Sequence, residues 1–376
     1  MKNELIDILF KYNTDNSEDY PSENILLCLE EIRNYLELKG IHCEISIYDV
    51  AGSDGRQVRR GNLFSYNPKS RNPFLLMQGH IDTVPFSGEY SYCTEAGELV
   101  GRGSVDMKGS ILSMIEAYEK MYHNEYINPP ALLITGDEEA NSFAGIRHFI
   151  ENNNIPICFC INGEPSSFEI NTAFKGVLIV EVLIKGGCLH SSDSNDVSII
   201  EKHIDLFNDV KKFIETVRSV SDERLGRTIA AFTVVNAGNK SNQLPEQMRL
   251  SFNARIVRDS GVYLDIYNDI LGKYLDKQEV CFDIMCFNPL EIDLEEKERN
   301  VLTRALNVSG FSFSETVMRA FTEASFLNQA GYRTIICGPG DLSLAHVDQK
   351  LERVDLGLLE SYRDFLIEFV KEYNKK

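Results

Sequence analysis

The stretch FLLMQGHID, residues 74–82, decides the fold class, because a short apolar run ends there directly before histidine and aspartate. The pattern occurs twice more, in ALLITGDEE at 131–139 and in ICFCINGEP at 157–165. Short apolar strands that alternate with helical periods, as at 107–121, are typical of an α/β domain with a mostly parallel sheet flanked by helices. Ligands bind such sheets at the carboxyl ends of strands. The sequence therefore predicts that the acids and the histidine after these runs lie close together.

Another pattern begins near residue 175, where long alternating runs such as VLIVEVLIKG and MRLSFNARIV are typical of antiparallel strands. They enclose one long helical stretch over roughly 197–219. We predict a smaller α+β domain at 175–287, inserted into a discontinuous domain formed by 1–174 and 288–376. A helical period over 21–38 belongs to the larger domain.

Composition limits the class of protein. A chain of 376 residues with 43% hydrophobic and 25% charged residues is typical of a globular protein with two domains. No apolar run reaches the about 18 residues of a membrane span, and the N-terminus lacks the features of a signal peptide. Nine scattered cysteines indicate reduced thiols and a cytoplasmic protein. The net charge of −19 argues against nucleic acid as a partner.

Two segments carry the first candidate ligands. His80 follows a strand, and Asp82 lies two residues further on, where a carboxylate can orient a metal-bound imidazole. Asp106 lies in GRGSVDMKG, a glycine-rich turn before a helix, and glycines let the backbone approach a ligand closely. Taken alone, each has an ordinary structural explanation.

Three further segments add carboxylates and a second imidazole. Glu138 and Glu139 follow a buried strand, Glu164 follows the next, and His346 follows a Gly-Pro-Gly turn. Adjacent glutamates are often only a solvated helix start. Two imidazoles and three carboxylates together suit zinc or a similar divalent ion, and two ions can share one bridging carboxylate.

Five motifs then carry a resemblance across nearly the whole chain, in the order QGHIDTVPF, GRGSVDMKGS, ITGDEEA, NGEPSS and GPG…AH. They resemble the metallohydrolase family that contains acetylornithine deacetylase, succinyl-diaminopimelate desuccinylase, glutamate carboxypeptidase and aminoacylases. The resemblance implies a metal-dependent enzyme that hydrolyses linear amides. It also implies a catalytic domain with an inserted lid that dimerises.

The resemblance assigns the metal ligands. Asp106 is expected to bridge two divalent ions, with zinc as the expected metal and cobalt or manganese as substitutes. His80 and Glu164 complete one site, and Glu139 and His346 complete the other. The peptide bond after Asp106 is expected to be cis.

The catalytic groups follow from the same resemblance. Glu138 is the expected general base, and Asp82 is the partner of His80. His190, in the HSS sequence at 190–192, is expected to reach the active site of the partner subunit in a homodimer and to stabilise the oxyanion. The sequence SSDSNDVSII after His190 departs from the family pattern.

Substrate contacts are expected from Asn242, Arg255 and Glu323. Glu323 lies in a Thr-Glu-Ala sequence that, with GPG and AH, looks most like acetylornithine deacetylase. We therefore expect an N-acyl amino acid as substrate, first N-acetyl-ornithine. The alternatives are succinyl-diaminopimelate desuccinylase, which GRGSVDMKGS and GEPSS resemble, and a dipeptidase or aminoacylase. A non-catalytic binding protein on the same scaffold would have lost ligands, and none is missing.

Overall fold

The computed structural model describes the chain except residues 17–22, 52–56, 72, 126, 141, 188, 193–196 and 376. The chain divides into two compact units, each formed by more than one segment. The first unit comprises Met1–Thr172, Ile292–Thr316 and Thr322–Lys376, and the second comprises Ala173–Glu291 and Val317–Phe321.

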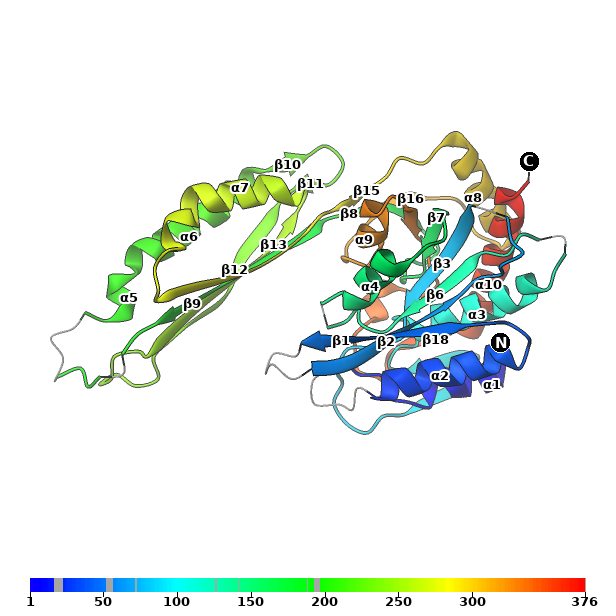
Figure 1. Cartoon of the computed structure of the whole chain (residues 1–376), viewed down its shortest axis with the longest axis horizontal. Helices are drawn as coiled ribbons and strands as arrows, with labels where there is room; N and C mark the ends of the chain where they lie inside the picture. The colour runs from blue at the N-terminus through cyan, green and yellow to red at the C-terminus, as the bar shows by residue number, and fades with distance from the viewer. Residues whose placement is uncertain are drawn as a thin grey trace. The chain divides into compact units, whose positions relative to one another are not determined.

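A sheet that is parallel at its centre forms the middle of the first unit (Figure 1). Its order is β1 (Glu44–Ala51), β2 (Gln57–Ser65), β6 (Ala131–Thr135), β3 (Phe74–His80), β7 (Ile157–Asn162), β17 (Arg333–Ile336) and β8 (Ile170–Phe174). β6, β3, β7 and β17 run parallel to one another, and the outer strands are antiparallel. β3, β6 and β7 are almost wholly buried, which explains their apolar sequences.

The register aligns the ends of these strands. His80 pairs with Thr135, and Gln78 pairs with Asn162. The segments that follow β3, β6 and β7 therefore begin at one edge of the sheet. The predicted α/β class, with a mostly parallel central sheet flanked by helices, is confirmed.

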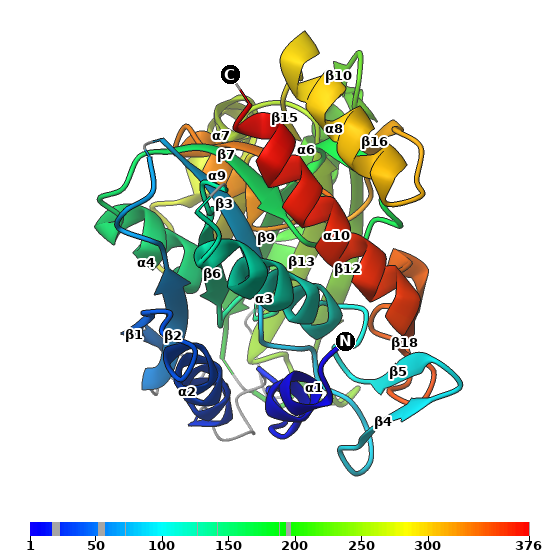
Figure 2. The ribbon, with the colours of Figure 1, turned by 90° about the vertical axis from the view of Figure 1, so that its right-hand side faces the viewer.

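Helices cover both faces of this sheet. α3 (Lys108–Tyr122) and α10 (Leu356–Tyr373) pack side by side on one face, as Figure 2 shows, while α4 (Ala144–Asn152) and α9 (Ala324–Gln329) lie on the other. The remaining elements are α1 (Asn3–Phe10), α2 (Glu23–Glu37), α8 (Glu296–Val308), the 3-10 turn η2 (Leu342–Leu344), β16 (Glu315–Met318), which pairs with β8, and a small sheet of β4 (Tyr92–Glu95), β5 (Glu98–Gly101) and β18 (Arg353–Asp355). α2 corresponds to the helix predicted at 21–38, whose first two residues lie outside the described residues.

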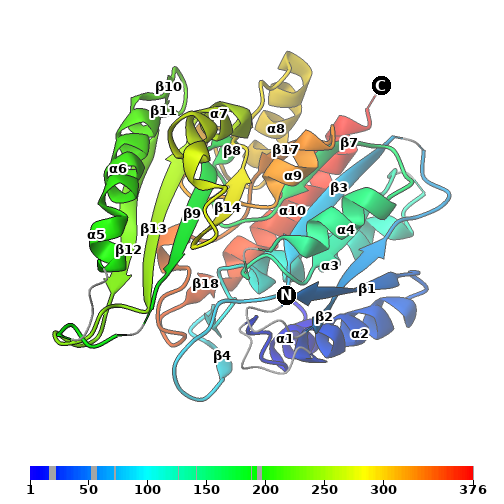
Figure 3. The same ribbon diagram turned by 60° about the vertical axis from the view of Figure 1, so that its left-hand side comes forward.

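The second unit is built on an antiparallel sheet. Its order is β12 (Ile229–Ala237), β13 (Gln247–Ile256), β9 (Gly176–Lys185) and β14 (Val280–Phe287), and the helices on one face are α5 (Ile199–Lys202), α6 (Ile204–Ser219) and α7 (Ser260–Leu271) (Figure 3). The short elements are β10 (Ser221–Asp222), β11 (Gly226–Arg227), η1 (Gly272–Tyr274) and β15 (Leu290–Glu291). Apolar side chains of the sheet and helices form a core of their own, among them Val180, Val182 and Phe213.

One helix prediction in this unit was wrong. The single helix expected over 197–219 is two helices, α5 and α6, separated at His203. The ring Nδ1 of His203 hydrogen-bonds to the carbonyl oxygen of Ile199, so this side chain competes for a carbonyl of the preceding turn. The backbone of His203 leaves the helical region there, at φ −114° and ψ 20°.

Among the described residues, no helix is long and apolar enough to cross a membrane.

Candidate metal centre

Three of the candidate segments leave the sheet at the same edge. His80 is the last residue of β3, Glu164 lies two residues beyond β7, and Glu138 and Glu139 follow β6. Because β6, β3 and β7 are adjacent and parallel, their ends bring these side chains together. Parallel strands need apolar sequences on both faces, and the polar side chains begin where the strands end.

Two turns of the first unit supply the other ligands. Asp106 lies between β5 and α3, and its peptide bond to Met107 is cis, which confirms the expectation from the resemblance. His346 follows η2 with a φ of 61°, in the left-handed region.

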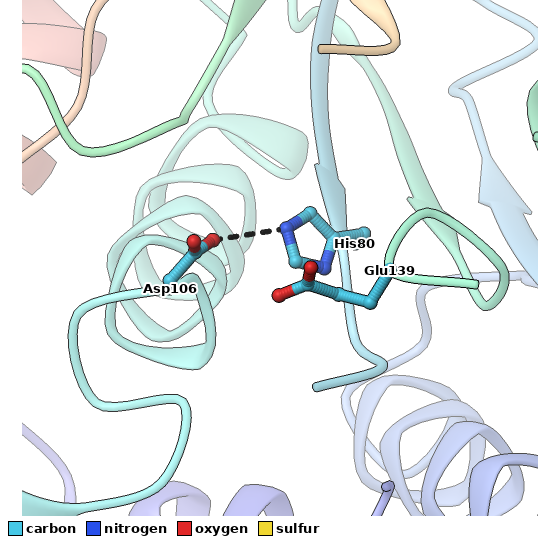
Figure 4. Close-up of side chains that lie close together, drawn as sticks. All are labelled: His80, Asp106 and Glu139. Carbon is cyan, nitrogen blue, oxygen red and sulfur yellow. Dashed lines mark hydrogen bonds and ion pairs between the residues drawn. The ribbon is translucent and has the colours of Figure 1, made fainter. Parts of the chain in front are cut away.

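The Asp106 carboxylate faces both histidines with one oxygen each. Its Oδ1 lies 3.1 Å from Nε2 of His80, which is 3.4 Å from Oε1 of Glu164. Its Oδ2 lies 3.1 Å from Nε2 of His346, which is 3.0 Å from Oε1 of Glu139. We call the group of Asp106 Oδ1, His80 and Glu164 the His80 side, and the group of Asp106 Oδ2, His346 and Glu139 the His346 side. In Figure 4 the side chains of His80, Asp106 and Glu139 converge, and atoms of these three lie within 4.8 Å of one another.

Burial and mutual charge set the proton affinities of these groups. Burial raises the pKa of Glu164 to about 7, and the Asp106 charge acts in the same direction. Hydrogen bonds to Asp106 and Glu139 raise the pKa of His346 to about 10. Burial alone would lower the pKa of His80, but Glu164 and Asp106 raise it well above its usual value. The carboxylates therefore favour a positive charge, either on the two imidazoles or on a bound cation, at the strand ends.

The residues present fit two divalent cations. Side chains of Asp106, Glu139 and Glu164 are at most 9% exposed and lie around two imidazoles, so their negative charges need compensation in a position largely shielded from water. Imidazole nitrogen and carboxylate oxygen are ligands that zinc and similar ions accept. The two oxygens of Asp106 provide a shared ligand for a pair of ions.

Asp82 holds the segment that carries both glutamates. Its Oδ1 and Oδ2 accept the backbone N–H groups of Glu138, at 3.2 Å, and Glu139, at 2.9 Å. The Asp82 carboxylate lies 3.6 Å from Nδ1 of His80, whereas the backbone carbonyl of Asp82 lies 2.9 Å from the same nitrogen. The expected pairing of His80 with Asp82 is therefore made more closely through the backbone carbonyl than through the carboxylate.

A buried polar network behind Asp82 was missed in the sequence. Asn16 donates from Nδ2 to Oδ2 of Asp82 at 2.6 Å, and Arg60 donates from Nε to Oδ1 of Asn16 at 2.7 Å. Asp137 lies 3.8 Å from Arg60, and burial, together with the Asp82 charge, raises the pKa of Asp137 to about 6. Arg59 and Arg60 are adjacent in β2, and the sequence alone gives no sign that Arg60 is buried and Arg59 exposed.

Glu323 lies beneath the strand ends and is fully buried. Its Oε2 accepts hydrogen bonds from Oγ1 of Thr135, at 2.6 Å, and from Nε2 of Gln78. Burial raises the pKa of Glu323 to about 8. This position suits a residue that supports β3 and β6, and the predicted contact with substrate stays a prediction.

The second unit contains the other three candidates, all exposed. Asn242 lies beside His190, with its Nδ2 3.5 Å from Nε2 of the imidazole, and its backbone oxygen accepts the N–H of Ser191 at 3.0 Å. The other ring nitrogen of His190 is 2.7 Å from Oγ of Ser192. Of these three candidates, the structure brings His190 and Asn242 together. Arg255 lies on β13.

An α/β sheet whose strand ends and loops gather two imidazoles and two glutamate carboxylates around one shared aspartate defines the class of metal-dependent hydrolases. The model of the Peptidase family M20/M25/M40 matches residues 76–372. The chain belongs to this family, and it is an enzyme that hydrolyses amide bonds.

Relatives and solved structures agree with this membership. An acetylornithine deacetylase of Proteus mirabilis is 26% identical, over 96% of this chain and 92% of its own length. The fold resembles that of a metallo-carboxypeptidase of the M20 family from Sulfolobus solfataricus, with a TM-score of 0.77 and 16% identity over 99% of both chains. It also resembles a dinuclear metal-binding peptidase of the M20 family from Bacillus subtilis, with a TM-score of 0.59 and 13% identity over 98% of this chain and 96% of that one.

Proposed function

We propose that this enzyme hydrolyses the amide bond of an N-acyl amino acid with two divalent ions, and that N-acetyl-ornithine is its substrate, giving ornithine and acetate. The observation that carries the two-ion proposal is the Asp106 carboxylate, which faces His80 with one oxygen and His346 with the other. The motif around Glu323 and the similarity to an acetylornithine deacetylase support the substrate.

The His80 side and the His346 side would each hold one ion, and zinc is the expected metal. Ions bound there supply an acidified water molecule and a Lewis acid for the amide carbonyl. Asp82 keeps Glu138 and Glu139 in place through their backbone N–H groups.

Glu138 is the proposed general base. Glu138 is 9% exposed. Its neighbour Glu139 contacts His346 and is the proposed metal ligand of the two, which leaves Glu138 for proton transfer. Glu138 takes a proton from water as the water oxygen bonds to the carbonyl carbon. It then gives this proton to the amine nitrogen as the C–N bond breaks, so that a carboxylic acid and an amine leave.

His190 and Asn242 are proposed to act on the oxyanion and the substrate, and Arg255 to hold the substrate carboxylate. The pairing of His190 with Asn242 supports a shared role. In this proposal the chain is a cytoplasmic homodimer, and each His190 serves the active site of the partner subunit.

A dipeptidase of the same family is one alternative. Succinyl-diaminopimelate desuccinylase and aminoacylase activities are the further alternatives. All of these use the same hydrolytic centre and differ in the side chains that contact the acyl group and the amine.

A substrate panel distinguishes these possibilities. Protein purified without chelator is supplied with zinc, cobalt or manganese and assayed with N-acetyl-ornithine, N-succinyl-diaminopimelate, other N-acyl amino acids and dipeptides. We expect the highest kcat/KM with N-acetyl-ornithine, and with this substrate a kcat lower by about 10²- to 10⁴-fold in Glu138→Gln. Preference for a dipeptide would overturn the substrate but keep the class. A protein that binds metal and hydrolyses none of them would be a binding protein.

A further inference from the structure

A buried ion pair between Arg102 and Glu352 joins the two turns that carry Asp106 and His346. The two residues are 3% and 0% exposed, and neither is a proposed metal ligand. Removing two charges from water costs several kcal/mol per ion, so such a pair needs hydrogen bonds that compensate. Both partners make them, and the bonds lead to the metal centre.

Glu352 caps the turn that holds Asp106. Its Oε1 accepts the backbone N–H groups of Gly103 at 2.8 Å, Val105 at 3.2 Å and Asp106 at 3.4 Å. The backbone oxygen of Glu352 also accepts the N–H of Gly101 at 3.0 Å. One carboxylate thus determines the path of the backbone up to the residue whose side chain faces both histidines.

Arg102 extends the same contact to the second turn. Its Nη1 bonds to Glu352, and its Nη2 donates to the carbonyl oxygen of Val347 at 2.8 Å. Val347 follows His346 directly, and His346 has a φ of 61°, which is unfavourable for a residue other than glycine and persists where the surroundings hold it. Arg102 is one of the groups that hold it.

The two sides of the metal centre therefore have different supports. His80 is fixed by β3, a strand inside the sheet, and its side chain is 1% exposed. His346 lies on a turn, and its side chain is 48% exposed. The turn depends on long-range contacts, of which the bond from Arg102 to Val347 spans 245 residues.

We propose that Arg102 and Glu352 are positioning residues for the His346 side of the centre. They hold Asp106 and His346 in relation to each other. Losing either residue therefore weakens the ion on the His346 side most, whereas the ion on the His80 side loses less affinity because β3 keeps His80 in place. This inference rests on the proposed two-ion function and adds to it an order in which the ions are lost.

The test is the Glu352→Gln variant, which keeps the size of the side chain and removes its charge. Zinc binding is measured by calorimetry and by competition with a chromophoric chelator. Wild-type protein is expected to bind two ions. In Glu352→Gln we expect the ion on the His346 side to be weakened by about 10- to 100-fold, the range for residues that orient metal ligands, and the other ion to be weakened by a smaller factor.

A matched control is Glu298→Gln. Glu298 is also buried, at 3% exposure, pairs with Arg333 at 2.7 Å and accepts a backbone N–H, that of Glu295, at 2.7 Å. It lies in α8, and its ion-pair partner Arg333 lies on β17, which carries no proposed metal ligand. We expect both ions to bind to this variant as they do to the wild type.

The His346→Ala variant, combined with Glu352→Gln, identifies which side of the metal centre is affected. His346→Ala should bind one ion, and adding Glu352→Gln should weaken that ion by a smaller factor than it weakens the second ion of the wild type. An equal or larger factor in the double variant would overturn the proposal, as would wild-type binding in Glu352→Gln or equal losses in Glu298→Gln. If Glu352→Gln does not fold, as judged by circular dichroism, Arg102→Met decides. Its side chain donates no hydrogen bond to Glu352 or to Val347, and unchanged zinc binding there would overturn the proposal. A wild type that binds no pair of ions would instead refute the proposed function.

Discussion

The candidate residues of the first unit, apart from His346, are largely buried and held from several directions, whereas those of the second unit are exposed. Asp106 contacts two imidazoles and donates its backbone N–H to Glu352, while the imidazole of His190 lies beside Ser192 and Asn242. A metal centre needs ligands that are oriented before the ion arrives. A group that meets a substrate needs an accessible surface. The difference predicts that changes in the first unit affect metal and chemistry, and changes in the second affect chemistry alone.

The largest expected effect is that of Glu138→Gln. The variant keeps the size of the side chain and removes its basicity, so kcat should fall by about 10²- to 10⁴-fold, while two ions remain bound. Steady-state kinetics and metal analysis of the same preparation measure both quantities.

Glu139→Gln is the matched comparison, because the two residues are adjacent and share the support from Asp82. It should lose metal from the His346 side. If Glu138→Gln loses metal and Glu139→Gln keeps it, the two roles are exchanged.

His190→Ala should lower kcat by about 10²- to 10³-fold, the range for a lost oxyanion donor, with metal content unchanged. Because His190 is exposed, its removal should change the free energy of unfolding by no more than about 0.5 kcal/mol. Denaturant unfolding beside the kinetic assay checks this. Loss of metal in this variant would contradict the distinction between the units.

Mixing two inactive variants tests whether His190 acts across a dimer. After exchange of subunits between His190→Ala and Glu138→Gln, a heterodimer carries both lesions at one site and leaves the other intact. Random pairing of equal amounts should restore up to about a quarter of wild-type activity, given the size of oxyanion stabilisation. No recovery after verified exchange would show that His190 acts within its own chain or not at all.

Metal affinity should rise with pH, because the ions displace protons from their ligands. His346, with a pKa raised to about 10, is protonated at neutral pH, so one proton must leave for each ion bound on the His346 side. Below about pH 7, Glu164 also takes up a proton, which weakens the His80 side. We expect the apparent zinc affinity to fall about tenfold per pH unit between about pH 8 and pH 6. Titrations in buffers of different ionisation enthalpy measure the protons released, and pH-independent binding would contradict this account.

The smallest effect is expected for Asn16→Ala, which removes a hydrogen bond to Asp82 without touching a ligand. Asp82 would hold Glu138 and Glu139 less firmly, so metal affinity should fall by about 10-fold, the low end for groups that orient ligands. Asn236→Ala, on β12 of the second unit, is the control and should leave zinc binding unchanged. Equal losses in both variants would assign the effect to stability.

The sequence by itself determined the α/β class and the order of the motifs. A parallel strand buried on both faces must be apolar, and the polar side chains that follow it stand out, as His80 and Glu164 do after β3 and β7. The family motifs then assigned a bridging role to Asp106, and the structure places its two oxygens against two imidazoles.

Only the tertiary structure decided which groups support these ligands. Asn16 reaches Asp82 across 66 residues, and Glu352 reaches the N–H of Asp106 across 246. The periodicity of apolar residues cannot predict such contacts, because they depend on where turns and loops pass in space and not on a local repeat. The sequence also could not show that Nδ1 of His80 bonds to a backbone carbonyl, because every residue type has a backbone oxygen. The ligands can therefore be predicted from the sequence, because metal binding restricts the type of side chain. The residues that support them can be identified only in the fold, because their role depends on their position in space.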